Sequence, residues 1–330
     1  MRKQEKKYNN PLSATYKGIS DLFKKQERVG ELQPGERLDG KKVLIDGSSS
    51  GLGLATAKEL ARLGAEVIMA VRSGIPAKGE EVKKASGSEK VHMLHGDMSD
   101  FESIRNLVKE IKSRFGKIDI LILNSAVVSK QARKTKYGLE EMFSVNFLSK
   151  FYFVNLLLHE DLFNKNGKGL PRIIFVSSES HRNPEAFEWE TFGEFKDYGM
   201  GKSVERYGYY KLLMTTFSQE LARRLNPNQN PEYSVFALCP GPVNSNIARE
   251  APAVFKPLMK IIFKAFFRSP EKACEPVVYF AASQSVEGKA TDYLFLMSRK
   301  TVDEKASNPE NGKKLWKMTE ELLKKHHISF

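Results

Sequence analysis

Residues 42–53 read Lys42-Val-Leu-Ile-Asp46-Gly47-Ser-Ser-Ser-Gly51-Leu-Gly53, a short apolar run followed by three closely spaced glycines. The apolar residues Val43, Leu44 and Ile45 predict a buried strand over 43–46, and the segment that begins near Leu52 predicts a helix. Glycines permit a tight turn that a ligand can approach closely, and the N-terminal end of a helix favours negative charge. The stretch therefore predicts a phosphate-binding loop; a flexible strand-to-helix turn is the alternative.

Beyond this loop, short apolar runs alternate with longer amphipathic segments. Strands are predicted at 43–46, 66–71, 91–94, 118–123, 172–176, 234–238 and 293–297. In one intervening segment, apolar residues recur at helical spacing: Ile104, Leu107, Val108, Ile111 and Phe115. This rhythm predicts an α/β fold with one doubly wound parallel sheet of about seven strands, flanked by helices. We expect a single domain over residues 39–330, preceded by a basic N-terminal arm at 1–38.

Composition limits the class of protein. The 330 residues are 41% hydrophobic and 28% charged, as in ordinary globular proteins. No run of about 20 apolar residues predicts a membrane-spanning helix. The two cysteines, Cys239 and Cys274, have no metal-ligand spacing and predict no metal site; their small number favours a reducing compartment. The first residues lack the apolar block of a secretory signal, so we expect a cytoplasmic protein.

The net charge of +13 favours anionic partners, which include nucleic acid, a membrane surface and a phosphorylated cofactor. Much of it lies in the arm at 1–38, which has few aromatic residues and no recognisable nucleic-acid module. We therefore expect no nucleic-acid partner, and interpret the arm as a solvated or membrane-proximal tail.

The end of the second predicted strand, Ala70-Val-Arg72, bears on the cofactor. An acidic residue about twenty positions after the glycines suits the ribose hydroxyl of NAD, whereas an arginine suits the 2′-phosphate of NADP. Arg72 therefore favours NADP(H), with NAD(H) left open. A solvated arginine at a strand end is the alternative.

The strongest chemical pattern is Tyr207-Gly-Tyr-Tyr-Lys211. Residues four apart share one face of a helix, so the phenol and the ammonium can stand side by side. A nearby cation favours phenolate and is expected to lower the pKa of the tyrosine, which suits acid–base chemistry. Tyr198 and Lys202 have the same spacing but lie among glycines and charges, whereas Lys211 leads into an apolar helical stretch. The pattern thus favours Tyr207.

Together, the glycine spacing, this Tyr–Lys pair and the turn at Cys239-Pro-Gly-Pro-Val243 resemble the short-chain dehydrogenase/reductase superfamily over about 39–323. The resemblance implies a Rossmann-like fold and hydride transfer between a nicotinamide and an alcohol or carbonyl group. It implies catalytic roles for Tyr207, Lys211, Ser178 and Asn146. Ser178 would polarise the reacting oxygen, although Ser177 and Ser178 could instead cap a loop. Asn146 would hold a water that relays protons from Lys211.

The resemblance also implies a set of cofactor-binding residues. Asp97 matches an adenine-contacting aspartate, although capping of the helix that begins near Asp100 is an equal alternative. The full set is Gly47, Ser49, Ser50, Gly51, Leu52, Gly53, Arg72, Asp97, Asn124, Tyr207, Lys211, Pro240, Gly241 and Val243.

Two positions depart from the family pattern. Asp46 stands where the family usually has threonine, and a carboxylate there would repel phosphate unless it turns away to accept backbone hydrogen bonds. Asn124-Ser-Ala stands where the family usually reads Asn-Ala-Gly. These departures support the alternative function, a non-catalytic dinucleotide-binding scaffold or sensor.

Three stretches, 52–58, 176–182 and 308–316, resemble a branch that contains retinol dehydrogenases, WW-domain-containing oxidoreductases and light-dependent protochlorophyllide reductases. The branch implies a lipophilic alcohol or carbonyl substrate, and the superfamily leaves a homo-oligomer open. Residues 252–268 place Lys256, Lys260 and Lys264 four apart among apolar residues. This segment could line the substrate pocket and touch anionic lipid as a peripheral membrane contact. Ordinary packing of a lid or subunit contact is the alternative.

Overall fold

The computed structural model describes residues 28–228, 230–243 and 268–330. Its element order is β1 (Lys42–Asp46), α2 (Gly51–Arg62), β2 (Glu66–Val71), α3 (Ala77–Ser86), β3 (Val91–His95), α4 (Phe101–Phe115), β4 (Ile120–Leu123), α5 (Glu141–Phe143), the π-helix η1 (Ser144–Leu148), α6 (Ser149–His159), β5 (Arg172–Val176), the 3₁₀ helix η2 (Glu179–Arg182), α7 (Met200–Leu225), β6 (Ser234–Cys239), α9 (Pro270–Ala273), α10 (Glu275–Ala282), the 3₁₀ helix η5 (Gln284–Val286), β7 (Thr291–Phe295), β8 (Ser298–Arg299), α11 (Glu304–Ser307) and α12 (Pro309–Lys325).

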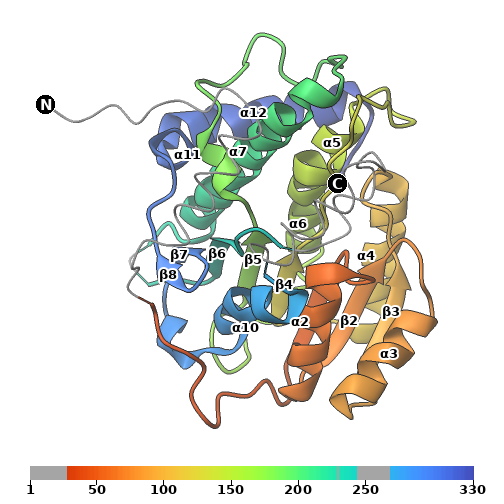
Figure 1. Ribbon diagram of the computed structural model, residues 1–330, viewed down its shortest axis with the longest axis vertical. Helices are drawn as coiled ribbons and strands as arrows, with labels where there is room; N and C mark the ends of the chain where they lie inside the picture. The colour runs from red at the N-terminus through yellow and green to blue at the C-terminus, as the bar shows by residue number, and fades with distance from the viewer. Residues whose placement is uncertain (1–27, 229, 244–267) are drawn as a thin grey trace, which may run out of the picture.

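One sheet runs through the molecule in the order β3-β2-β1-β4-β5-β6-β7-β8 (Figure 1). The first seven strands pair in parallel, and β8 pairs antiparallel with β7. The predicted doubly wound α/β sheet is confirmed, with β8 as a further two-residue strand. A strand of two residues is too short to produce a periodic signal in the sequence.

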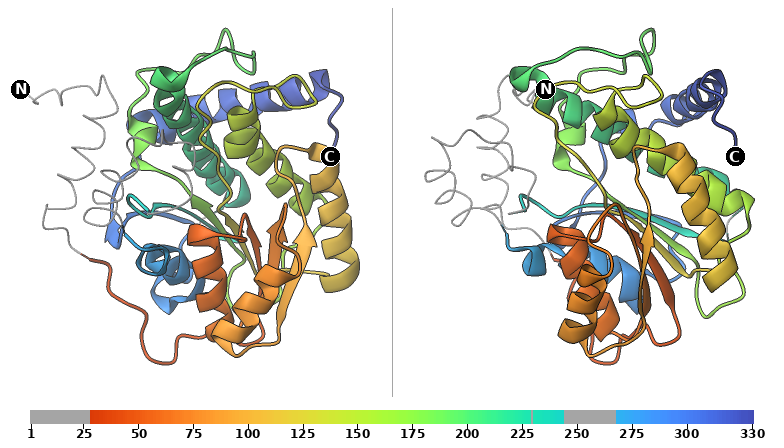
Figure 2. Two further views of the ribbon diagram at one scale, coloured as in Figure 1. Left: turned by 45° about the vertical axis from the view of Figure 1, so that its right-hand side comes forward. Right: turned by 90° about the vertical axis from the view of Figure 1, so that its right-hand side faces the viewer.

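Helices cover both faces of the sheet, as Figure 2 shows. Val43 and Ile45 of β1 belong to the core under α2 and α10, whereas Leu44 between them belongs to the core under α4, α6 and α7. Because both faces of the strand are buried, its three central residues, 43–45, are all apolar instead of alternating with polar ones.

The strand order reverses between β1 and β4, which are neighbours in the sheet. β2 and β3 continue the sheet beyond β1, and β5 to β8 continue it beyond β4. In open α/β sheets, ligands bind beyond the carboxyl ends of the strands at such a switch point. This geometry brings together the segments that follow β1, β4, β5 and β6.

Part of the predicted arm falls within the described residues. Val29 N–H donates to the carbonyl oxygen of Met297 at 2.7 Å, and the buried Glu36 carboxylate accepts hydrogen bonds from the Ser283 hydroxyl and from Gln284 N–H. The predicted boundary at residue 38 stays a prediction. Residues 1–27 of the arm and most of the segment at 252–268 lie outside the described residues.

Candidate active site

A cleft of about 1080 Å³ lies along the carboxyl ends of the strands. It is lined by the glycine loop, the ends of β2 and β3, residues 124–129, the end of β5, part of α7 and residues 239–243. Every residue predicted to bind cofactor lies on its wall, as do three of the four predicted catalytic residues; Asn146 does not. The tertiary structure therefore gathers into one cleft residues that are up to 196 positions apart in the sequence, from Gly47 to Val243.

The glycine loop is shaped to receive an anion. Gly47 has a φ of +64°, and a Cβ on it would lie 2.7 Å from Cα of Ser125. A Cβ on Gly53 would lie 2.4 Å from the Gly47 carbonyl oxygen, so both positions require glycine. Ser50 precedes α2 without a side-chain capping hydrogen bond, which leaves first-turn N–H groups as donors for an anion. These residues fit the pyrophosphate of a dinucleotide.

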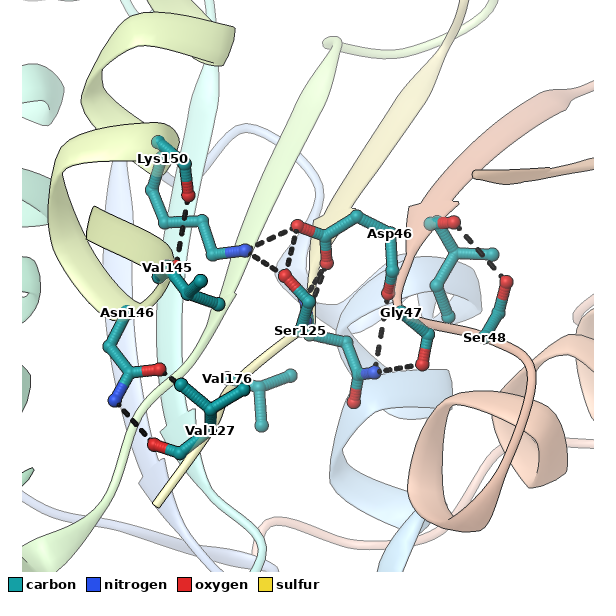
Figure 3. Close-up of polar contacts among 12 residues, drawn as sticks. Asp46, Gly47, Ser48, Ser125, Val127, Val145, Asn146, Lys150 and Val176 are labelled. Carbon is teal, nitrogen blue, oxygen red and sulfur yellow. Dashed lines mark hydrogen bonds and ion pairs between the residues drawn. The ribbon is translucent and has the colours of Figure 1, made fainter. Parts of the chain in front are cut away.

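Asp46 does not point at this anion site. Its carboxylate is fully buried and turns toward β4 (Figure 3). One oxygen accepts hydrogen bonds from the backbone N–H groups of Asn124 at 2.5 Å and Ser125 at 2.6 Å. The other accepts from the Ser125 hydroxyl at 2.9 Å and from the ammonium of Lys150. The departure at position 46 is thus compatible with phosphate, because the carboxylate is turned away and paired.

Lys150 lies beside this site but was not among the site residues predicted from the sequence. It lies in the first turn of α6, is fully buried, and donates to both Asp46 and Ser125. Burial lowers the pKa of its ammonium, while the attraction and hydrogen bond of Asp46 act against that change. A lone lysine within the apolar stretch 147–158 was the available signal, but its partner is 104 positions away.

The two serines after β5 have different surroundings. The Ser177 hydroxyl is buried and hydrogen-bonded to the Thr215 hydroxyl at 2.7 Å. The Ser178 hydroxyl is half-buried on the cleft wall and accepts from Ser180 N–H at 3.2 Å. The geometry therefore favours Ser178 as the serine available to a ligand.

His181 fixes the backbone of Ser178. Its Nδ1 lies 2.6 Å from the Ser178 carbonyl oxygen, and its Nε2 accepts from Asp303 N–H at 3.2 Å. These partners require a neutral imidazole that carries its proton on Nδ1. Complete burial lowers the pKa of His181 to about 4, in agreement with the neutral form.

Tyr207 and Lys211 lie on one face of α7 and on the cleft wall. Nζ of Lys211 lies 5.6 Å from the centre of the Tyr207 ring and donates a 2.8 Å hydrogen bond to the Val176 carbonyl oxygen. Burial, with a smaller contribution from the positive charge of Lys150, lowers the pKa of Lys211 to about 7.

The expectation of a lowered tyrosine pKa is wrong for this structure. Burial raises the pKa of Tyr207, and the hydrogen bond with the Ser178 hydroxyl only partly offsets that rise. Removal from water disfavours the phenolate more than the surrounding groups favour it. At neutral pH the phenol is therefore protonated and able to donate.

The second Tyr–Lys pair does not resemble the first. Tyr198 precedes α7, which begins at Met200, and its hydroxyl donates to the buried Glu140 carboxylate at 2.7 Å. Lys202 is exposed on the helix. The two residues do not share a helix face, so Tyr198 has a packing role.

Asn146 lies in the middle of the π-helix η1 and is fully buried. Its side-chain amide forms two hydrogen bonds with the backbone of Val127, from the N–H at 2.8 Å and to the carbonyl at 2.9 Å. π-helical turns occur frequently at functional sites. The side chain supports the cleft wall from behind, and the water-holding role stays a prediction.

Arg72 and Asp97 lie at the ends of β2 and β3. Arg72 is exposed on the cleft wall, and no hydrogen bond or ion pair ties it to another described residue. One oxygen of Asp97 accepts from Ser99 N–H at 2.9 Å and from its hydroxyl at 2.7 Å. Asp100, rather than Asp97, caps α4, so the helix-cap alternative for Asp97 is wrong.

Residues 28–228, 230–243 and 268–330 contain no helix that could span a membrane.

The cleft at the switch point, the glycine loop and the Tyr–Lys pair together define a short-chain dehydrogenase/reductase. The family model described as short chain dehydrogenase matches residues 41–189. Mouse retinol dehydrogenase 14 is 32% identical, over 90% of each chain, and the chicken WW domain-containing oxidoreductase is 30% identical, over 89% of this chain and 70% of its own. The crystal structure of an uncharacterised protein from Mycobacterium paratuberculosis superimposes with a TM-score of 0.67 at 26% identity, over 91% of this chain and 98% of the other.

The chain belongs to the short-chain dehydrogenase/reductase superfamily, in its retinol dehydrogenase-like branch. It is an NAD(P)-dependent oxidoreductase that acts on CH–OH or C=O groups.

Proposed function

We propose that the chain transfers a hydride between NADP(H) and a lipophilic alcohol or carbonyl compound, with Tyr207, Lys211, Ser178 and Asn146 as its catalytic residues. The convergence of Tyr207, Lys211 and Ser178 on the cleft that also contains the glycine loop carries this proposal. The nicotinamide supplies or accepts the hydride when the cofactor is bound.

The remaining chemistry belongs to the chain. Ser178 offers its hydroxyl to the substrate oxygen, and Tyr207 gives that oxygen a proton during carbonyl reduction or removes one during alcohol oxidation. The raised pKa of Tyr207 keeps its proton in place before reduction. Lys211, held by the Val176 carbonyl, supplies positive charge beside the phenol and opposes the cost of forming phenolate.

Arg72 supports the NADP(H) preference. Its guanidinium is exposed on the cleft wall at the end of β2, where a 2′-phosphate would lie in this fold. Charged groups bind phosphate through short, charge-assisted hydrogen bonds, and an arginine without a described ion-pair partner is available for them. Asp97 and the wall at Pro240, Gly241 and Val243 complete the proposed cofactor site.

The substrate class rests on the cleft wall and on the likeness to retinol dehydrogenases. Apolar side chains of Val127, Val128, Val145 and Val176 line the cleft together with its polar groups. The best support for a non-catalytic scaffold was Asp46, Ser125 and Ala126. Asp46 and Ser125 bind each other and Lys150, so these two departures from the family pattern have a structural explanation. They therefore give the scaffold alternative less support.

The test is a panel of retinoid-like and short hydrophilic aldehydes and alcohols, followed by nicotinamide absorbance with NADPH, NADH and their oxidised forms. We expect faster turnover of the lipophilic compounds with the NADP pair. Turnover that survives Tyr207→Phe would contradict the assigned mechanism. Absence of turnover with every compound, despite tight NADPH binding, would favour the scaffold.

We also propose that the protein is cytoplasmic and contacts anionic membrane surfaces through the lysines within 252–268. Co-sedimentation with anionic vesicles at low salt tests this, and no pelleting would contradict it. A homo-oligomer, which the superfamily leaves open, is measured by light scattering on the same preparation.

A further inference from the structure

Two opposite charges are buried beside the cofactor cleft, and the proposed chemistry does not use them. The side chains of Lys150 and Asp46 are each 0% exposed. Burying a charged pair carries a large desolvation cost for each ion, and similar pairs can often be replaced by apolar residues without loss of stability. A contribution to stability therefore explains poorly why this pair is buried here. The contacts of the two side chains indicate a different role.

The contacts of the pair converge on the segment that follows β4. Asp46 accepts hydrogen bonds from Asn124 N–H, Ser125 N–H and the Ser125 hydroxyl. Lys150 donates both to Asp46 and to the Ser125 hydroxyl. The end of β1 and the start of α6 thus hold two consecutive residues of this segment from two directions (Figure 3).

The same segment is held again two residues later. Asn146, one helical turn before Lys150, binds both backbone polar groups of Val127. The Asn124 side chain donates in turn to the Gly47 carbonyl oxygen at 2.9 Å, within the glycine loop. Residues 124–128 form a wall of the cofactor cleft, so the buried pair connects this wall to the phosphate loop.

Resting on the proposed function, we infer that Lys150 is a positioning residue for the cofactor. Its ammonium balances the charge of Asp46, so that the carboxylate can hold the backbone of Asn124 and Ser125 in the path that shapes the cleft. The Asp46–Ser125–Lys150 network thus replaces the usual threonine and alanine of the family with a charged arrangement that serves the same wall. Without Lys150, Asp46 would be an uncompensated buried charge and the segment would move.

The first experiment measures equilibrium binding of NADPH by its fluorescence to wild type and to Lys150→Met, together with amide hydrogen exchange of the cofactor-free proteins. We expect Lys150→Met to raise the Kd for NADPH about 10-fold or more, since small displacements of a binding wall have large effects. We also expect faster exchange at the amides of Asn124 and Ser125. Exchange at these amides also depends on overall stability, so a control variant of lowered stability is needed to isolate the effect on the wall.

Arg172→Met is the matched control. Arg172 is also a buried cation, bound to the carbonyl oxygens of Phe280 and Ala281 and to Glu287, but it does not line the cleft. We expect it to lower stability and to leave the Kd for NADPH within about 2-fold of wild type. An equal rise in Kd in Arg172→Met, or unchanged binding by folded Lys150→Met, would overturn the inference.

A pair of double variants decides the matter if Lys150→Met does not fold. Asp46→Asn/Lys150→Met removes both charges but keeps an oxygen for the two backbone N–H groups, whereas Asp46→Ala/Lys150→Met removes both charges and that oxygen. The inference requires weaker NADPH binding, by about 10-fold, in the alanine variant; equal binding in the two variants overturns it. If wild type binds neither NADPH nor NADH, the proposed function fails first; if wild type binds and these variants do not differ, only the role of Lys150 fails.

Discussion

Gly208 lies directly against the carbonyl oxygen of Ser180: a Cβ on Gly208 would be only 2.8 Å from that atom. Gly208 follows Tyr207 on α7, and Ser180 lies in η2, two residues after Ser178. The missing side chain therefore allows the helix that carries the phenol to approach the segment that carries the serine hydroxyl. This close approach lets the Tyr207 phenol form its hydrogen bond with the Ser178 hydroxyl.

We expect Gly208→Ala to lower kcat by about 10- to 100-fold, because a backbone oxygen cannot rotate away and α7 must shift outward. Gly201→Ala is the control on the same helix. A Cβ there meets nothing within 4 Å, so that change should leave kcat intact and stabilise the protein by up to about 1 kcal/mol. Steady-state kinetics and thermal unfolding of both variants check this. Equal kcat in the two would show that the close approach has no catalytic value.

The two tyrosines followed by lysine four positions later should respond differently to loss of the hydroxyl. Tyr207→Phe removes the proposed proton donor and should abolish turnover while NADPH still binds. Tyr198→Phe leaves the buried Glu140 carboxylate short of one donor and should cost about 1–3 kcal/mol of stability with turnover retained. Turnover assays paired with denaturant unfolding separate the two outcomes, and an active Tyr207→Phe would rule out the assigned donor.

Arg72→Ala should weaken NADPH selectively. Loss of a charge-assisted hydrogen bond to a phosphate costs about 1.5–3 kcal/mol, which corresponds to roughly a 10- to 100-fold rise in KM for NADPH. KM for NADH, which lacks the 2′-phosphate, should change little. Kinetics with both cofactors measure the ratio. A similar loss for NADH would mean that Arg72 supports the fold of the cleft rather than the phosphate.

Activity should depend on the charge of Lys211. Because its pKa lies at about 7, the ammonium loses its proton as the pH rises through that value, and log(kcat/KM) for NADPH should fall above it. Lys150 lowers this pKa, whereas Cys239 and Asp46 raise it. Lys150→Met should therefore move the decline to higher pH, while Arg172→Met should not. An alkaline limb that stays in place in Lys150→Met would show that the two lysines do not interact.

His181 should make stability sensitive to acid. Its folded-state pKa of about 4 lies below its ordinary value of 6.5, so the unfolded chain binds the extra proton between these values. Its contribution is complete above about pH 6.5 and is lost as the pH falls toward 4, by about 3 kcal/mol in total. Unfolding free energies of wild type and His181→Asn should converge over this range. Parallel curves would mean that another group controls the acid transition.

Much of the fold was readable from the chain because it depends on local patterns. The apolar run before Gly47 and the helical period after it identify the first strand and helix, and all seven predicted strands occur, with ends that shift by up to two residues. The proximity of Tyr207 and Lys211 could be predicted for the same reason, because residues four positions apart lie on the same face of a helix. The family pattern favours Ser178 over Ser177, and the hydrogen bond between the Ser177 and Thr215 hydroxyls supports that choice, which stays a prediction.

What the sequence alone determined is the order of strands and helices, the glycine loop and the spacing of Tyr207 and Lys211, each of which depends on a few neighbouring residues. The tertiary structure decided the rest. Asp46 turns from the phosphate site toward Lys150, and burial raises rather than lowers the pKa of Tyr207. The Ser180 carbonyl oxygen packs against Gly208. Each of these depends on desolvation or on contact between residues far apart in the chain. Desolvation and these long-range contacts arise only when the sheet has formed and brought those residues together.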